Sequence, residues 1–249
     1  MLESLYNSIL IPWLILGLIT SIILLKVSAP YGKFATQSWG PNVSFRWGWI
    51  IQEMVSPICF SAFFLIGSNN HQPITWLFFI IWNIHYFNRS IIFPLRQKQT
   101  ATCPLVIVLS AIFFNLINGF TNGYFLGNLV EYPNNYIYSW NFIVGSILLI
   151  LGIIINIKSD NILIKIKKEN KGYQVPRGFL YNYISCPNYL GEIIEWLGFF
   201  LMTLSAPAFL FLFWTMANLI PRAISNHNWY VNKFSDYPDE RKAIIPFFI

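Results

Sequence analysis

Charged side chains are scarce in this sequence. Of its 249 residues, 10% are charged, whereas 55% are hydrophobic and 18% are aromatic. Soluble domains carry roughly a quarter charged residues, so this chain lacks the side chains needed to cover a surface facing water. Lipid removes that requirement. The composition therefore argues against an ordinary soluble domain and predicts a membrane protein.

Cysteine is also scarce, and the common nucleotide and metal motifs are absent. Cys59, Cys103 and Cys186 are odd in number and follow no spacing, which favours small core residues over a disulfide framework or a zinc site. There is no G-x-G-x-x-G after a strand, no P-loop and no H-E-x-x-H. We therefore expect no metal, and any dinucleotide must be bound without a Rossmann domain.

The basic residues do not form a compact module. The formal net charge is +6, but the Lys and Arg residues are spread over several connections, which argues against nucleic acid as a partner. The first apolar run lacks a basic start and a small-residue cleavage site. It is therefore interpreted as a retained helix rather than a cleaved signal peptide.

Long apolar stretches dominate the sequence. A helix needs about 20 apolar residues to cross ~30 Å of hydrocarbon. Seven stretches approach this length: Ser8–Leu25, Trp47–Ser68, Ile74–Leu95, Cys103–Phe120, Trp140–Ile157, Tyr189–Ser205 and Ala206–Ile220. The last two are continuous, and the Ser205–Ala206–Pro207 step predicts a sharp turn between them. A single kinked helix is the alternative, because membrane helices tolerate proline. We expect an all-α polytopic membrane protein with seven transmembrane helices.

The basic residues predict the orientation of these helices. All sixteen lie in or beside the odd-numbered connections or in the C-terminal tail: Lys26, Lys33, Arg46, Arg89, Arg96, Lys98, Lys158, Lys165, Lys167, Lys168, Lys171, Arg177, Arg222, Lys233, Arg241 and Lys242. The N-terminus and the even-numbered connections have no Lys or Arg, and their charged residues are the acids Glu3 and Glu131. By the positive-inside rule the N-terminus lies outside and the C-terminus in the cytoplasm, which requires an odd helix count.

Glu53 is a carboxyl group inside an apolar helix, in the segment Trp49–Met54. It lies about six residues, or ~9 Å, from the cytoplasmic end of the second predicted helix. An ionised acid inside the membrane costs on the order of 2.5–3.5 kcal/mol, so Glu53 is a candidate functional residue. The alternative is a buried carboxyl that only pairs with a neighbouring helix.

The third predicted helix carries His85, Tyr86, Phe87, Asn88 and Arg89. Tyr86 falls about nine residues, or ~13 Å, from the cytoplasmic end, at a depth similar to that of Glu53. A neutral carboxyl and a phenol can both donate hydrogen bonds to a ketone oxygen in a dry pocket. His85 is the alternative acid, although a lone histidine in an apolar helix is more often a core residue.

Polar residues also gather at the cytoplasmic ends of the fifth and sixth predicted helices. Asn156 and Asp160 are four residues apart, as are Asn188 and Glu192, so each pair lies on one helix face. Beside the basic fifth connection, these pairs suit a phosphate-bearing cytoplasmic ligand. The alternative for Glu192 is a favourable interaction with the helix dipole, because this acid lies in a first turn.

These segments resemble the membrane steroid 5α-reductase family. The resemblance covers most of the chain and is most specific at Gln52–Glu53 and His85–Arg89. Other matching segments are Tyr31–Lys33, Gly172–Gly178, Asn188–Trp196, Pro221–Ala223, Asp236–Pro238 and Arg241–Phe247. Alone, Asn188–Glu192 is also similar to membrane sterol reductases and isoprenylcysteine methyltransferases, which are the alternative enzymes.

The resemblance implies an enzyme that uses NADPH to reduce the C4–C5 double bond of a 3-oxo-Δ4-steroid to the 5α-dihydro product. Glu53 and Tyr86 would hold the C3 ketone oxygen with support from Gln52, and Trp49 would help to wall the steroid site. The residues that would line NADPH are Asn156, Asp160, Asn188, Glu192, Arg222 and Tyr230, with Tyr31 and Tyr173 as weaker matches. We expect a monomer with one membrane-embedded domain, 1–249, and a catalytic and cofactor-binding block at about 100–249.

The chain departs from the animal enzymes of this family at a few positions. Basic residues expected around the fifth connection are replaced by Ile164 and by Lys167, which keeps the charge but lacks the bidentate fork of a guanidinium. Ser225–Asn226–His227 replaces a run of histidines. Such changes affect the expected cofactor affinity rather than the reaction class. The Asn-, Ile- and Lys-rich loops favour a bacterial source and an inner membrane; a eukaryotic protein would lie in the endoplasmic reticulum. In both cases the active site faces the cytoplasm.

A non-catalytic transporter or lipid-binding membrane protein is the alternative outside enzymes, because intramembrane acids also occur in transport pathways. Such a protein predicts paired broken helices and repeat symmetry between its halves. The sequence has neither feature, so we favour the reductase.

Overall fold

The computed structural model describes residues 1–36, 38–69, 71–97, 101–169 and 172–249, and most of them are helical. Lys98 and Lys171, two of the basic residues that predict the orientation, lie outside the described residues. Contacts divide the chain into two compact units. The first unit comprises 1–8 and 29–137, and the second comprises 9–28 and 138–249. Helix α1 (Leu2–Lys26) therefore contributes to both.

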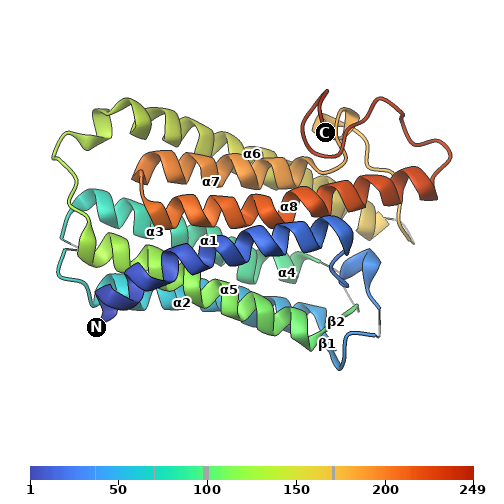
Figure 1. The fold of residues 1–249 in the computed structure, drawn as a ribbon. Coiled ribbons are helices and arrows are strands. Elements are labelled where there is room, and N and C mark those ends of the chain that lie inside the picture. Colours follow the sequence, from blue (N-terminus) through green and yellow to red (C-terminus); the bar gives the residue numbers. More distant parts are fainter. Residues whose placement is uncertain (37, 70, 98–100, 170–171) are drawn as a thin grey trace. The chain divides into compact units, whose positions relative to one another are not determined.

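The first unit is built around two long helices, α2 (Phe45–Leu65) and α5 (Leu105–Tyr124), which lie side by side (Figure 1). Strands β1 (Asn42–Ser44) and β2 (Thr102–Pro104) precede these helices and pair antiparallel. The remaining elements are helical and short: a 3-10 helix at Gly32–Phe34, α3 (Pro73–Phe87), a π-helix at Asn88–Ile92, α4 (Phe93–Arg96), a π-helix at Phe125–Leu129, and a 3-10 helix at Tyr136–Tyr138 that crosses into the second unit.

Glycines set the close packing of α2 against α5. A Cβ placed on Gly119 would lie 2.9 Å from the Ser56 carbonyl oxygen, and one on Gly127 would lie 2.6 Å from that of Phe64. Gly123 meets the α2 backbone in the same way, at Phe60. Small residues one turn apart let membrane helices approach backbone to backbone. The first unit therefore has two helices fixed against each other along one ridge.

A π-helix interrupts the third predicted helix just after Tyr86. The Phe93 N–H donates to the Asn88 carbonyl oxygen, five residues back. Pro94 explains the change, because it has no N–H and its ring clashes with the carbonyl group one turn earlier. The sequence pattern predicts a continuous helix at Ile74–Leu95. The structure instead gives α3, the π-helix and α4 in direct succession.

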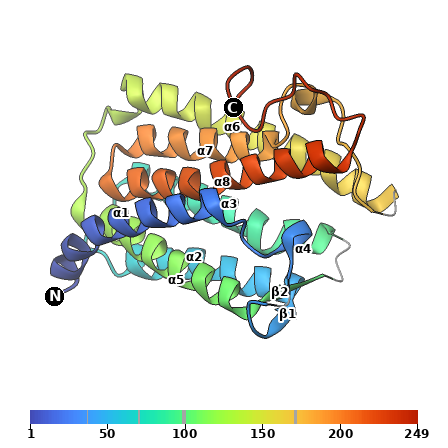
Figure 2. The same ribbon diagram turned by 45° about the vertical axis from the view of Figure 1, so that its right-hand side comes forward.

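The second unit contains α6 (Trp140–Glu169), α7 (Pro187–Thr203) and α8 (Ala206–Lys233), together with most of α1 (Figure 2). A 3-10 helix (Phe179–Asn182) lies in the connection before α7. Helix α1 is attached to α8 by the indoles of Trp13 and Trp214, which stack at 4.4 Å, and Trp214 Nε1 donates to the Trp13 carbonyl oxygen over 3.0 Å.

The turn predicted at Ser205 is confirmed. Helix α7 ends at Thr203, and Leu204 adopts a left-handed conformation with φ of 43°. The Ser205 hydroxyl then caps α8 by accepting a hydrogen bond from the Ala208 N–H over 3.3 Å. Pro207 lies in the first turn of α8, where its missing N–H costs nothing. The continuous apolar run therefore forms two helices rather than one kinked helix.

Helices α6 and α8 extend furthest beyond their predicted ends. Helix α6 continues from Ile157 to Glu169, and α8 continues through Pro221 to Lys233. Both extensions keep one face buried after the apolar run ends, with Asp160 and Ile164 on α6 and Ala223 and Tyr230 on α8. Packing of that face explains why the helices do not stop where their hydropathy falls.

Within the described residues, five helices are long and apolar enough to cross a membrane: α1, α2, α5 with its π-helical extension, α6 and α8. The other two expected crossings are a shorter helix and a segmented one. Helix α7 has 17 residues, about 26 Å at 1.5 Å per residue. The third predicted crossing is the segmented run from α3 to α4. The structure thus shows a mostly helical protein with several helices that could span a membrane.

Candidate functional site

A buried hydrogen-bond network in the first unit includes the predicted ketone-binding residues. Tyr86 donates its phenol O–H to Asn115 Oδ1 over 3.4 Å. Asn115 Nδ2 donates to the Gln52 carbonyl oxygen over 2.7 Å. Gln52 Nε2 donates to Glu53 Oε1 over 3.3 Å. Three helices, α2, α3 and α5, thus contribute to one network that runs from the Glu53 carboxyl to the Tyr86 phenol.

Packing fixes the Tyr86 side chain in this network. It is 3% exposed, and its ring lies 5.3 Å from the indole of Trp82 and 5.2 Å from the imidazole of His85. The Ser90 hydroxyl of the following π-helix donates to the Tyr86 carbonyl oxygen over 2.6 Å. A rigidly held phenol is what a preorganised donor to a ketone requires.

Asn115 is a member of this network that the sequence analysis does not identify. It is 2% exposed and lies on α5 one turn before Gly119, on the face packed against α2. In the sequence it is one polar residue inside a long apolar run. It lies four residues before Gly119, which in turn lies four before Gly123, and this spacing is the signal that places it on the helix–helix ridge.

Trp49 lies one turn before Glu53 on α2 and is held by the π-helix. Its indole N–H donates to the Arg89 carbonyl oxygen over 2.9 Å, and the Arg89 guanidinium lies 5.2 Å from its ring centroid. Trp49 also lines a shallow surface depression with Phe45, Arg46, Phe93, Pro94 and Gln97, which has no internal space for a water molecule. It is therefore not a formed ligand site. Its role toward a steroid stays a prediction.

In the second unit, α6 and α7 bring the other predicted polar residues together. A Cβ on Gly152 would lie 2.6 Å from the Gly191 carbonyl oxygen, so the two backbones are in contact. Just beyond this contact, Asn156 Nδ2 donates to the Asn188 carbonyl oxygen over 3.0 Å. Asn188 Nδ2 in turn donates to Asp160 Oδ1 over 3.1 Å. The structure thus joins three of the residues that the family resemblance assigns to the cofactor.

Arg222 and Tyr173 belong to the same unit and interact electrostatically. Arg222 is 8% exposed on α8. Burial raises the pKa of the Tyr173 phenol, and the positive charge of Arg222 partly offsets this effect. A guanidinium near a phenol supplies a positive charge and several donors, which are the groups that bind phosphate and ribose.

Tyr230 is the predicted residue nearest the C-terminal end of α8. It is 8% exposed, and its ring stacks on that of Tyr237 at 5.5 Å with an interplanar angle of 10°. Glu192 lies on α7, one turn after Asn188, and is partly buried. Tyr31 belongs to the first unit, where it precedes the 3-10 helix Gly32–Phe34. The roles of these three residues in cofactor binding remain predictions.

Tyr181 is a second buried residue that the sequence does not single out. It is 1% exposed, and its hydroxyl donates to the Ser159 carbonyl oxygen over 3.4 Å. Burial, together with the negative charge of Asp160, raises the pKa of Tyr181 well above its usual range. Tyr181 is therefore a neutral donor that supports the α6 backbone beside Asp160. An aromatic residue in a polar connection gives no sequence signal for this position.

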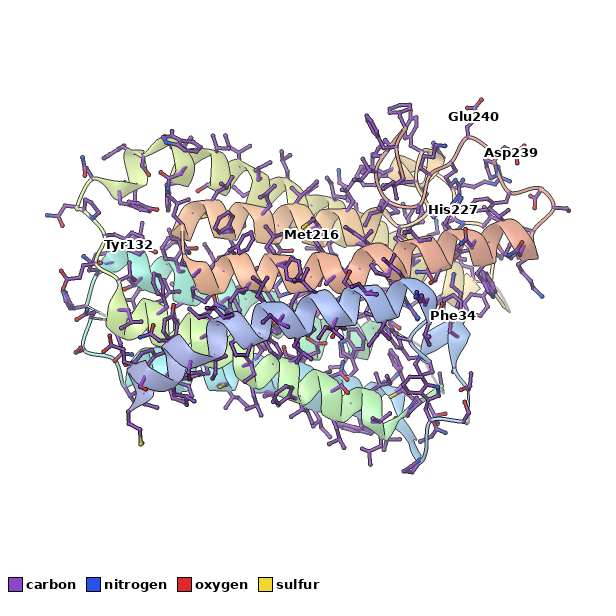
Figure 3. The ribbon with its side chains drawn as sticks, in the orientation of Figure 1. Phe34, Tyr132, Met216, His227, Asp239 and Glu240 are labelled. Atoms are coloured by element: carbon purple, nitrogen blue, oxygen red, sulfur yellow. The ribbon has the colours of Figure 1, made fainter. Side chains whose placement is uncertain are left out.

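The segment Ser225–Asn226–His227 takes part in packing within the second unit. Ser225 accepts a hydrogen bond from the Ser28 hydroxyl over 2.9 Å. Asn226 Nδ2 lies 3.5 Å from the Tyr189 hydroxyl oxygen. His227, labelled on α8 in Figure 3, lies with Nδ1 2.7 Å from the Ser185 hydroxyl oxygen. Ile164 is 5% exposed on α6. Ile164 and the three residues of this segment therefore lie at buried or hydrogen-bonded positions.

Comparisons with known proteins agree with the resemblance read from the sequence. The family model described as 3-oxo-5-alpha-steroid 4-dehydrogenase matches residues 101–249. A steroid 5-alpha-reductase of Gossypium hirsutum is 38% identical over 98% of this chain and 98% of its own length. One of Arabidopsis thaliana is 40% identical over 92% of this chain and 90% of its own. The 3-oxo-5-alpha-steroid 4-dehydrogenase 1 of Bos taurus is 34% identical over 94% and 93%.

These similarities cover both units, because they extend over nearly the whole chain. The relatives come from plants and a mammal, so they give no support to the bacterial source favoured by the loop composition. Together with the several apolar helices, they identify an integral membrane oxidoreductase of steroid metabolism. The chain belongs to the 3-oxo-5-alpha-steroid 4-dehydrogenase, or steroid 5-alpha-reductase, family.

Proposed function

We propose that this protein uses NADPH to reduce the C4–C5 double bond of 3-oxo-Δ4-steroids, giving 5α-dihydro steroids. Family membership supports the reaction class. The observation that carries the proposal is the buried network from Glu53 through Gln52 and Asn115 to Tyr86, because it links both donors expected at the substrate ketone. The α face at C5 comes from the family alone.

The proposed role of Glu53 and Tyr86 follows from the electronics of an enone. Hydride addition at C5 moves negative charge through the C4–C3 bond onto the ketone oxygen, and a proton is then added at C4. The phenol of Tyr86 and the protonated acid of Glu53 donate hydrogen bonds to that oxygen and stabilise the developing enolate. Gln52 orients the Glu53 carboxyl through its own hydrogen bond.

The proposed cofactor residues are Asn156, Asp160, Asn188, Glu192, Arg222 and Tyr230, with Tyr31 and Tyr173 as weaker candidates. Their chemistry fits a dinucleotide: amides and carboxylates bind amide and ribose groups, and a buried guanidinium binds phosphate. When bound, NADPH supplies the hydride. The Asn188–Asp160 bond holds the start of α7 to α6 and keeps these polar groups in place.

The proposed membrane arrangement has seven crossings, with the N-terminus outside and the C-terminus in the cytoplasm. The basic connections support this orientation. To reach seven, α7 and the run from α3 to α4 must cross in addition to the five longer helices. Steroid would enter from lipid and NADPH from the cytoplasm, and a monomer suffices because both sets of proposed residues belong to one chain.

The proposed function is tested with the purified protein in lipid nanodiscs, supplied with NADPH and either testosterone or progesterone. Mass spectrometry and co-elution with authentic 5α- and 5β-standards identify the product. We expect the 5α-dihydro steroid and equimolar NADPH oxidation. Recovery of the 5β product, or of unchanged steroid from protein that binds NADPH, would contradict the proposal. Co-purifying S-adenosylmethionine would instead favour a methyltransferase.

A further inference from the structure

Asn115 uses both ends of its amide inside the first unit. Its Nδ2 donates to the Gln52 carbonyl oxygen over 2.7 Å, and its Oδ1 accepts from the Tyr86 hydroxyl over 3.4 Å. The side chain is 2% exposed. It is therefore a buried connection between the backbone of α2, next to Glu53, and the phenol on α3.

The chemistry of the partners fixes which way the amide points. A backbone carbonyl can only accept a hydrogen bond, so the NH₂ end of Asn115 must face Gln52. The oxygen of Asn115 must then face Tyr86, and the phenol must donate to it. The contact with Gln52 thus determines the direction of the Tyr86 O–H bond when no ketone is present.

The helix packing explains why a side chain as short as asparagine can make both contacts. Asn115 begins the ridge that continues at Gly119, where a Cβ would lie 2.9 Å from the Ser56 carbonyl oxygen. This backbone contact holds α5 close to α2, so the amide reaches a helix carbonyl directly. The glycine contacts between the two helices therefore fix the position of Asn115 relative to α2.

The two hydrogen bonds differ in length in a way that suits substrate binding. The 2.7 Å bond to Gln52 is short and anchors Asn115. The 3.4 Å bond to Tyr86 is longer than the about 2.5–3.0 Å usual for an O–H···O hydrogen bond and is therefore weak. It satisfies a buried hydroxyl in the free protein, and the phenol can leave it at little cost to donate to another oxygen.

We propose that Asn115 is a positioning residue that holds the Tyr86 phenol ready for the substrate ketone and releases it when the ketone arrives. The inference rests on the proposed ketone role of Tyr86. Asn115 itself does not touch the reacting atoms. Its effect on turnover passes through Tyr86, whose orientation relative to Glu53 it sets by way of the Gln52 carbonyl.

The test compares Asn115→Leu, Tyr86→Phe and the double variant, each in nanodiscs with NADPH and testosterone. Asn115→Leu keeps the size of the side chain and removes both hydrogen bonds. We expect its kcat to fall by roughly 10- to 100-fold, because a misplaced catalytic group costs about this much, while the KM for NADPH stays unchanged. Added to Tyr86→Phe, it should cost no more than about twofold, because the two residues act on one step.

Asn115→Asp provides the conservative rescue. A neutral Asp carboxyl can donate to the Gln52 carbonyl and accept from Tyr86, whereas the carboxylate cannot donate. This variant should be active at low pH, and its kcat should fall as the pH rises and its carboxyl ionises. The pH profile of the wild type should lack this fall. Asn122→Leu is the matched control: Asn122 is 1% exposed on the same helix, with its amide bonded to the Asn118 carbonyl oxygen. Its kcat should match that of the wild type.

The outcomes separate this inference from the function on which it rests. An inactive wild type would overturn the proposed function. An active wild type and a damaged Tyr86→Phe, with Asn115→Leu within twofold of wild-type kcat, would overturn the role of Asn115 alone. The same conclusion follows if Asn115→Leu reduces kcat by the same factor with and without the Tyr86 hydroxyl. If Asn115→Leu does not fold, a flat pH profile of Asn115→Asp overturns the role.

Discussion

The amide nitrogen of Asn188 donates to Asp160 Oδ1 over 3.1 Å, which joins the first turn of α7 to the extended part of α6. Asp160 is 6% exposed, so this bond lies in a buried setting. A buried carboxylate requires such partners, because an unpaired charge there would be very costly. The bond therefore fixes both residues where the proposed cofactor site needs them.

Asp160→Asn should weaken NADPH binding. The substitution removes a charge and leaves two amides facing each other, so the Asn188 donor loses its charged acceptor. A hydrogen bond to a charged group contributes about 1.5–3 kcal/mol, which corresponds to a rise of roughly 10- to 100-fold in Kd. Titration calorimetry with NADPH measures this. Glu169→Gln on the same helix is the control, because Glu169 forms an exposed ion pair with Lys165, and the substitution should leave Kd unchanged.

Gly152→Ala should separate α6 from α7. The added Cβ would lie 2.6 Å from the Gly191 carbonyl oxygen, and the backbone cannot yield as a side chain would. Overpacking of this kind costs about 1–3 kcal/mol. We expect a lower Tm in nanodiscs and weaker NADPH binding. Ile150→Ala is the control, because Ile150 is 56% exposed and this variant introduces alanine into the same helix at a position without that contact. An unchanged Tm for Gly152→Ala would show that the helices do not pack as described.

The helical framework could be predicted from the sequence to a large extent. Hydropathy identifies α2, α5 and α8, and the Ser205 turn follows from a serine before a proline. Hydropathy cannot predict that α6 continues to Glu169, because that extension is stabilised by a buried face rather than by an apolar run. The π-helix before Pro94 is likewise a consequence of local hydrogen bonding that periodicity does not reveal.

The candidate site could be predicted only in part. An ionisable residue inside an apolar helix is costly in lipid, which identifies Glu53. Tyr86 is found by its depth relative to Glu53, and Asp160 by its spacing from Asn156. Asn115 and Tyr181 carry no charge and have no such positional signal relative to another candidate residue. Their importance appears only when the partners across the helix interface are known.

Arg241 should stabilise the C-terminal tail much more than Arg177 does. Arg241 is 3% exposed, donates from a guanidinium nitrogen to the Pro176 carbonyl oxygen over 3.1 Å, and lies 4.9 Å from the Tyr237 ring centroid. Arg177 forms an exposed ion pair with Asp236 at 3.2 Å. We expect Arg241→Met to cost about 2–4 kcal/mol and Arg177→Met under about 1 kcal/mol.

Two measurements compare these variants: the shift in Tm, converted to a free energy of unfolding, and limited proteolysis. Arg241→Met should expose the segment from Gly172 to Gly178 to cleavage, because the Pro176 contact is lost. Equal effects of the two substitutions would mean that the buried contact of Arg241 contributes no more than a surface pair.

Glu53→Gln should reduce turnover while leaving the fold intact. Gln keeps an N–H donor, but this donor is weaker than a carboxylic acid. Removing one donor to a developing oxyanion costs on the order of 10²–10³ in kcat. Product formation by mass spectrometry gives the rate. Glu131→Gln, at an exposed residue in a connection, is the control and should retain full activity. A fully active Glu53→Gln would remove Glu53 from the reaction.

Turnover of Tyr86→Phe tests the central claim most directly, because this substitution removes one hydroxyl and keeps the ring. The variant should keep the Tm and the NADPH Kd of the wild type, while its kcat with testosterone falls by roughly 10²- to 10³-fold. A kcat equal to that of the wild type would contradict the ketone-binding role of Tyr86, and with it the account of the buried network.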